Sequence, residues 1–275
     1  IPLHPERVNA LFGERFYYYG PSLAMLAPLA FEAARRHGPR WLLVLVVLAM
    51  SAAVVLAGMR AGWLALALIA IVYAAVIARR DRRAAAVYGL AVTALAVILG
   101  SAGYFGSELV RDRVQQTLLL GQGSEQALEH AFTRRLQIWG TAGRMIADHP
   151  VNGVGVRAFQ HAYPDYARPG DPNLPTPDAE IGGNHPHNLW LESLTDAGVI
   201  GLAGLLGAVA CVIIAWRRST PGGRHAATPY VLCLFVILFP FNTHFALYGA
   251  YLSGTIWWLT GLAFGGLLSA RRYYG

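Results

Sequence analysis

The sequence predicts an all-α membrane protein, a polytopic bundle of transmembrane helices with one large loop that itself contains helices. Of the 275 residues, 55% are hydrophobic and only 13% are charged, and the mean hydropathy is +0.42. Apolar runs close to the roughly 20 residues that cross a bilayer recur along the chain. All 22 basic residues are arginine and stand mostly in short clusters between these runs, as membrane topology produces. A nucleic-acid-binding protein would gather them on one surface, so we expect no nucleic-acid partner.

Four transmembrane helices are expected within residues 1–105. The apolar runs place them at about 17–33, 41–59, 61–78 and 84–105. Arg60, between Gly58 and Gly62, separates the second and third runs, and the chain must turn there because one continuous helix would be far too long. The chain starts at Ile1 without a signal peptide, so we expect further spans upstream.

Residues 106–197 differ in character and are expected to form the large loop. Apolar residues recur at helical spacing over 108–120 and 125–147, and Pro150 should end the second of these helices. Six prolines between 163 and 186 predict an irregular segment. Residues 188–197 predict a short amphipathic helix, which leads into the last part of the chain. That part, 198–275, is expected to hold three spans, at about 198–216, 229–247 and 250–269.

The arginine clusters orient the predicted spans. Placing the clusters at 35–40, 79–83 and 217–224, together with the C-terminus, in the cytoplasm lets seven spans alternate without contradiction. Arg60, the loop 106–197 and the turn at 248–249 then face outward. The loop's own arginines do not oppose this orientation, because long loops translocate largely regardless of charge.

Arginines are the candidate phosphate-binding residues. An arginine so close to lipid is costly, which favours a functional role for Arg60, and its flanking glycines would let a ligand approach the backbone. The alternative is an interfacial arginine that reaches back to water. Arg134 and Arg135 lie on the predicted loop helix, and guanidinium groups bind two phosphate oxygens at once. Neighbours on a helix point about 100° apart, so one of this pair is expected on a solvated face.

His185, His187 and Asn188 form the sharpest polar cluster. A neutral imidazole is suited to take a proton from an attacking hydroxyl near pH 7, and His187 lies just before the predicted helix, at the membrane boundary. Asn188 either contacts substrate or caps the following helix. Glu192 orients a histidine, binds sugar hydroxyls or lies on the surface. No carboxylate or cysteine stands at ligand spacing near the two histidines, so a metal is not expected.

Glycines mark two further positions. Gly198 and Gly201 are expected to permit close packing of the fifth span. Gly153 and Gly155 are expected to permit a tight turn after Pro150.

Several segments resemble a known family, the O-antigen ligase and polymerase superfamily of bacterial inner-membrane glycosyltransferases. The matching segments are GMRAG at 58–62, RLQIW at 135–139, MIADHPVNGVGVRAF at 145–159 and HNLWLESLTDAGVIGL at 187–202. The last fits the family's pattern of His, a small polar residue, nine positions and then GxxG. The likeness runs from about Gly20 to the end of the fifth span. It departs at Gly20-Pro21-Ser22, where relatives often have an Asn-Pro-Asn type of sequence.

The resemblance implies a multi-pass protein of the bacterial inner membrane with its active site facing the periplasm. The implied reaction moves undecaprenyl-pyrophosphate-linked O-antigen onto lipid A–core oligosaccharide in lipopolysaccharide biosynthesis, with inversion and without metal or cofactor. His187, Arg60 and Arg135 receive catalytic or donor-binding roles. Arg134 replaces Arg135 if the alignment shifts by one residue. The residues expected to bind substrate are Arg60, Arg134, Arg135, His185, Asn188 and Glu192.

Three alternatives stay open. An O-antigen polymerase would use the same donor with another glycan as acceptor, and a protein O-oligosaccharyltransferase would use a protein. A polysaccharide transporter or flippase belongs to a different class and would need ionisable residues in mid-span. The predicted spans have almost none, which disfavours the transporter.

Overall fold

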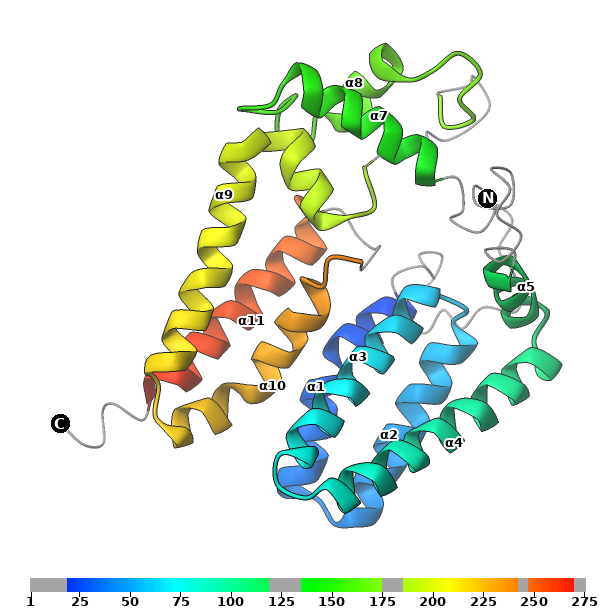
Figure 1. Ribbon diagram of the computed structural model, residues 1–275, viewed down its shortest axis with the longest axis vertical. Helices are drawn as coiled ribbons and strands as arrows, with labels where there is room; N and C mark the ends of the chain where they lie inside the picture. The colour runs from blue at the N-terminus through cyan, green and yellow to red at the C-terminus, as the bar shows by residue number, and fades with distance from the viewer. Residues whose placement is uncertain (1–18, 119–134, 175–184, 242–246, 270–275) are drawn as a thin grey trace. The chain divides into compact units, whose positions relative to one another are not determined.

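The computed structural model describes residues 19–118, 135–174, 185–241 and 247–269, and every regular element in these ranges is a helix (Figure 1). This confirms the predicted all-α class. The chain divides into two compact units, which we describe separately. The first unit contains residues up to 118 together with 229–237. The second contains 119–228 and the residues from 238 onward.

Four helices of the described residues are long and apolar enough to cross a membrane, so the chain is polytopic. They are α3 (Arg60–Ala78), α4 (Arg82–Gly106), α9 (Leu189–Arg218) and α11 (Ala250–Ser269), and they match the predicted third, fourth, fifth and seventh spans. The predicted second span is α2 (Arg40–Leu56), which is apolar but has 17 residues. The turn expected between the second and third spans is present, and Gly58 adopts a positive φ of 65° there.

Small residues allow close packing in the first unit. On α1 (Tyr19–His37), Ala24 and Ala27 are fully buried. A side chain at Gly20 would meet Ala57, and one at Gly62 would meet Val54. Helices in membranes approach closely where such small residues line their contacts, and α1, α2 and α3 pack on one another in this way.

A buried carboxylate explains why α1 extends beyond the predicted end of the first span at residue 33. Glu32 is only 2% exposed and accepts hydrogen bonds from Arg35 Nε (3.0 Å), Arg36 Nε (2.9 Å) and the Tyr73 hydroxyl (2.8 Å). A buried charge needs such partners, and the two arginines reach it only if the helix continues through them. Their charges also leave α1 outside the four apolar spans.

The sixth span was placed wrongly at 229–247. Helix α10 runs from Pro221 to Ile237, because Thr220 caps its start by accepting the Gly223 N–H at 3.1 Å and proline suits the first helical position. Pro240 follows its end, where a proline disfavours further helix. Residues 242–246 of the predicted span lie outside the described residues.

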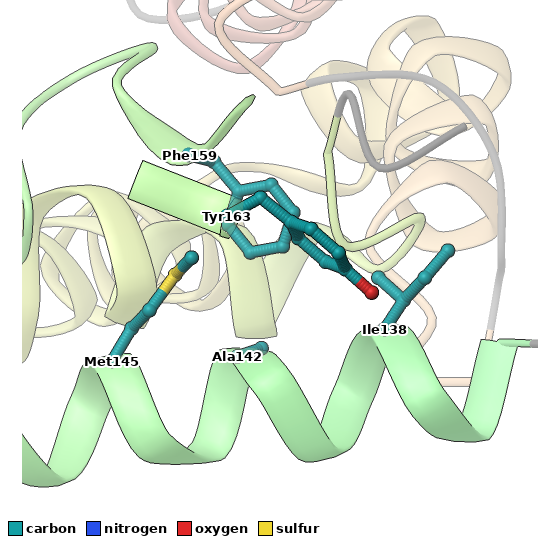
Figure 2. Close-up of a cluster of buried hydrophobic side chains, with 5 residues drawn as sticks. All are labelled: Ile138, Ala142, Met145, Phe159 and Tyr163. Atoms are coloured by element: carbon teal, nitrogen blue, oxygen red, sulfur yellow. The ribbon is translucent and has the colours of Figure 1, made fainter. Parts of the chain in front are cut away.

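Two short helices of the second unit pack through a cluster of buried hydrophobic side chains (Figure 2). Helix α7 (Arg135–Asp148) presents one face to α8 (Phe159–Tyr166). The cluster consists of Ile138, Ala142, Met145, Phe159 and Tyr163, each at most 3% exposed. Figure 2 shows the two rings of α8 lying over the α7 side chains. Helix α7 ends at Asp148, as the following proline predicts. The packing of α8 on α7 holds together the two helices that flank residues 149–158.

Candidate active site

Helix α9 is broken at Gly198, where the amphipathic helix and the fifth span of the sequence analysis meet. Gly198 has φ 62° and ψ −158°, a conformation open almost only to glycine, and α9 bends sharply after its first turns (Figure 1). The break leaves backbone N–H and C=O groups of α9 without partners inside the helix, and residues 150–155 form hydrogen bonds with them. Four hydrogen bonds do this: Val199 N to Pro150 O (2.9 Å), Ile200 N to Val151 O (3.3 Å), Val154 N to Thr195 O (2.8 Å) and Gly155 N to Asp196 O (3.0 Å).

We call these four bonds the Gly198 clamp. Gly198 lies directly against the Val151 backbone, and a Cβ there would collide with it. The close approach that the sequence predicted is therefore to a loop and not to another helix. Gly153 and Gly155 have positive φ values of 67° and 112°, which confirms the predicted tight turn after Pro150.

Asp196 completes the clamp and was missed by sequence reasoning. Its carboxylate is 2% exposed and accepts the Arg157 backbone N–H at 2.7 Å. Arg157 has a positive φ of 63°, so Asp196 stabilises a strained residue of the loop. Two polar residues, Thr195 and Asp196, just before an apolar run were the available signal, because buried polar groups need partners.

The segment before α9 holds His187 in a left-handed backbone conformation, with φ 55°. A non-glycine residue seldom adopts such a value, although histidine does so more often than most, and strain of this kind costs about 1–3 kcal/mol. The next residue, Asn188, caps α9 by accepting the N–H groups of Trp190 (3.1 Å) and Leu191 (3.0 Å). Its amide also donates to Pro240 O at 2.6 Å. The capping interpretation of Asn188 is confirmed, and the cap fixes the residue beside His187.

His185 lies directly beside His187. The ring centroids are 4.0 Å apart, and the His187 backbone N–H donates to His185 Nδ1 at 3.1 Å. Burial, together with the smaller effects of the nearby His187 and Arg135, lowers the pKa of His185 to about 2. Nδ1 therefore accepts, the ring is neutral, and its 3.9 Å approach to the Glu192 carboxylate is no ion pair.

Helix α7 brings Arg135 to the same place. Trp139, one turn after Arg135, donates its indole N–H to Pro186 O at 2.9 Å. Arg135 is close enough to His185 for its positive charge to oppose protonation of that ring. The structure thus gathers Arg135 and the histidine segment within the second unit. Arg134 lies outside the described residues.

Glu192 is buried, with 2% exposure, so the surface interpretation was wrong. Its two carboxylate oxygens accept backbone N–H groups of Leu247 (2.7 Å) and Tyr248 (3.4 Å). Trp190 donates its indole N–H to Leu238 O at 2.9 Å. Together with the Asn188 bond to Pro240, these contacts tie the start of α9 to the chain between α10 and α11. Sugar binding by Glu192 stays a prediction.

Arg60 belongs to the first unit, where it is the first residue of α3. Its Nη1 donates to Thr117 Oγ1 at 3.4 Å, on helix α5 (Glu108–Leu118). The space beside its flanking glycines is filled, since a side chain at Gly58 would meet Leu109 and one at Gly62 would meet Val54. Both glycines therefore serve close packing, and ligand approach to their backbone stays a prediction. A shared site for Arg60 and His187 stays a prediction.

The comparisons with known proteins gave one match. A model of the protein family described as O-antigen ligase matches residues 45–206, which is more than half of the 275 residues. The matched range includes Arg60, Arg135 and His187. No curated protein and no solved structure matches the chain.

Proposed function

Because the chain belongs to the O-antigen ligase family, we propose that it transfers O-antigen polysaccharide from undecaprenyl pyrophosphate to lipid A–core oligosaccharide. Family membership and the four membrane-length helices support a multi-pass membrane protein with ligase- or polymerase-type glycosyl transfer. The arginine clusters support an inner-membrane orientation in which the site faces the periplasm.

His187 acts as general base in the proposed mechanism. The imidazole takes the proton of the acceptor hydroxyl while that oxygen attacks the anomeric carbon of the donor sugar. The bond between this carbon and the pyrophosphate oxygen breaks, and the pyrophosphate lipid leaves with the electron pair. Attack opposite to the leaving group inverts the anomeric carbon. A positioned base of this kind contributes about 100- to 10,000-fold in rate.

Arg135 and Arg60 bind the pyrophosphate in this proposal. One further negative charge develops on the leaving pyrophosphate as the C–O bond breaks, and a guanidinium fork stabilises the group with two hydrogen bonds. The position of Arg135, close to His185 and one turn before Trp139, supports its role beside the histidine segment. Arg60 supplies a second guanidinium from the first unit.

The main support for this proposal is the left-handed backbone conformation of His187 and the hydrogen bonds that restrain its neighbours. Its φ of 55° is held by elements far apart in the sequence, through the Trp139 bond to Pro186 and the Asn188 bond to Pro240. Strained residues persist where surrounding structure over-determines them, and they cluster at active sites. The Trp139 bond restrains Pro186, just before His187, and the Pro240 bond restrains Asn188, just after it. This suits a base that must meet a reacting hydroxyl within about 3 Å.

The test is transfer by the purified full chain from undecaprenyl-pyrophosphate-linked O-antigen. Three acceptors are offered in parallel: lipid A–core, a second lipid-linked glycan and a serine-rich peptide. We expect product on lipid A–core, with and without EDTA. Product only on the second glycan would identify a polymerase, and product only on the peptide a protein-glycosylating enzyme.

A further inference from the structure

The first unit contains a long apolar cavity of about 610 Å³. It follows α3 from Trp63 to Ile77, which is about 21 Å at 1.5 Å per residue, most of the roughly 30 Å apolar core of a bilayer. Side chains of α2 and α4 line it as well, among them Val47 and Leu95. A cavity of this length and lining suits one extended hydrocarbon chain better than a compact polar molecule.

Two arginines, Arg60 and Arg113, lie close in sequence to residues that line the end of this cavity where α3 begins, although neither lines the cavity itself. Val110 and Val114 of α5 line that end, and Arg113 lies next to Val114. Arg60 precedes Trp63 by one helical turn, and Arg113 is near enough to repel its charge. Thr117 ties Arg60 to α5, since its hydroxyl accepts from Arg60 Nη1 at 3.4 Å and donates to the Arg113 backbone carbonyl at 2.7 Å.

The two guanidinium groups are suited to share an anion. Both side chains are partly buried, and burial lowers the pKa of Arg113. The nearby Asp112 opposes this shift, and a ligand anion placed between the two guanidinium groups would also offset their mutual repulsion. Arg113 Nη1 donates to Gln116 Oε1 at 2.8 Å, which leaves further N–H donors of its five for a ligand.

A third donor lies at the same end. Trp63 lines the cavity, and its indole Nε1 is buried without a hydrogen-bond partner among the described residues. Buried polar groups are nearly always paired, so the position of this N–H independently indicates a polar ligand group at the mouth of the cavity.

We propose that the cavity holds the hydrocarbon chain of a polyprenyl phosphate lipid and that Arg113 binds its phosphate together with Arg60. The identity of the chain rests on the proposed function, which makes the donor a polyprenyl-linked glycan. The cavity, Arg113 and Trp63 add the place where that lipid is held in the first unit.

Binding of undecaprenyl phosphate to the purified full chain in nanodiscs tests the phosphate contact. Arg113→Gln should weaken binding by at least about tenfold, because it removes a charged hydrogen bond to the phosphate. The affinity of Arg113→Lys should lie between those of wild type and Arg113→Gln. Arg111→Gln is the matched control on α5, since Arg111 instead donates to the Tyr104 and Phe105 carbonyls. Equal affinity of Arg113→Gln and wild type would overturn the assignment of Arg113.

A second pair of variants tests the cavity. Ala96→Phe, which fills it, should weaken binding of undecaprenyl phosphate, whereas Ala94→Phe, exposed on the same helix and outside the lining, should not. Displacement by phosphatidylglycerol as effective as by unlabelled undecaprenyl phosphate would overturn the polyprenyl assignment. Because lipid binding is measured without glycan transfer, a result that refutes this lipid site is distinct from a result that refutes the ligase activity.

Discussion

Gly198→Ala tests the clamp that joins α9 to the loop 150–155. Alanine at φ 62° and ψ −158° costs about 1–3 kcal/mol in backbone strain. Its Cβ also collides with the Val151 backbone, so the loop must move away. If two of the four clamp hydrogen bonds are lost at about 1 kcal/mol each, the free energy of unfolding falls by at least about 3 kcal/mol.

The matched control is Gly204→Ala, on the same helix. A Cβ at Gly204 meets nothing within 4 Å, and alanine in a helix is favoured over glycine by about 0.5–1 kcal/mol. Thermal unfolding of the two purified variants in one detergent, followed by tryptophan fluorescence, compares them directly. Gly198→Ala should melt several degrees below wild type, and Gly204→Ala at or above it. Similar melting of both variants would refute the clamp.

Three further predictions concern the site and the topology. The pKa of His185 is lowered in the folded chain. As the pH falls below about 6.5, the ordinary pKa of histidine, the free energy of unfolding should therefore fall by up to about 1.4 kcal/mol per pH unit. Melting temperatures measured over a pH series should fall less in His185→Gln than in wild type, and an unchanged slope would contradict the burial argument. Arg135→Ala should abolish transfer while the protein still inserts, and Arg135→Lys should recover only part of it because the fork is lost; full activity of the alanine variant in the transfer assay would remove Arg135 from the site. A reporter fused at Gly170 should report the periplasm and one at Gly222 the cytoplasm, and the reverse pattern would contradict the orientation.

The helices were predictable because their signals are local. Apolar runs and flanking arginines located α3, α4 and α11 to within a few residues. The sixth span failed because its start depends on a cap at Thr220, ahead of the apolar run. The end of α1 was missed because Glu32 draws Arg35 and Arg36 into the helix, and no hydropathy pattern records such a pairing.

The residue types of the candidate site could be predicted from the sequence, but the hydrogen bonds that position these residues could not. His187, Asn188 and Arg135 stood out as polar residues in an apolar chain, and Arg135 does lie near the histidine segment. The partners of Asn188 and Glu192 are backbone groups of Pro240, Leu247 and Tyr248. Backbone groups carry no sequence signature, so these long-range bonds could come only from the structure.

The role of His187 as general base is tested most directly by comparing transfer by His187→Ala and His185→Ala, each with and without EDTA. His187→Ala should lower the rate of transfer to lipid A–core by about 100- to 10,000-fold, while binding of the lipid-linked donor persists. His185→Ala should be milder, because His185 supports the loop through its Nδ1 bond to the His187 N–H. Near-normal turnover by His187→Ala would contradict the base assignment. Equal losses in both variants with inhibition by EDTA would instead indicate a two-histidine metal site.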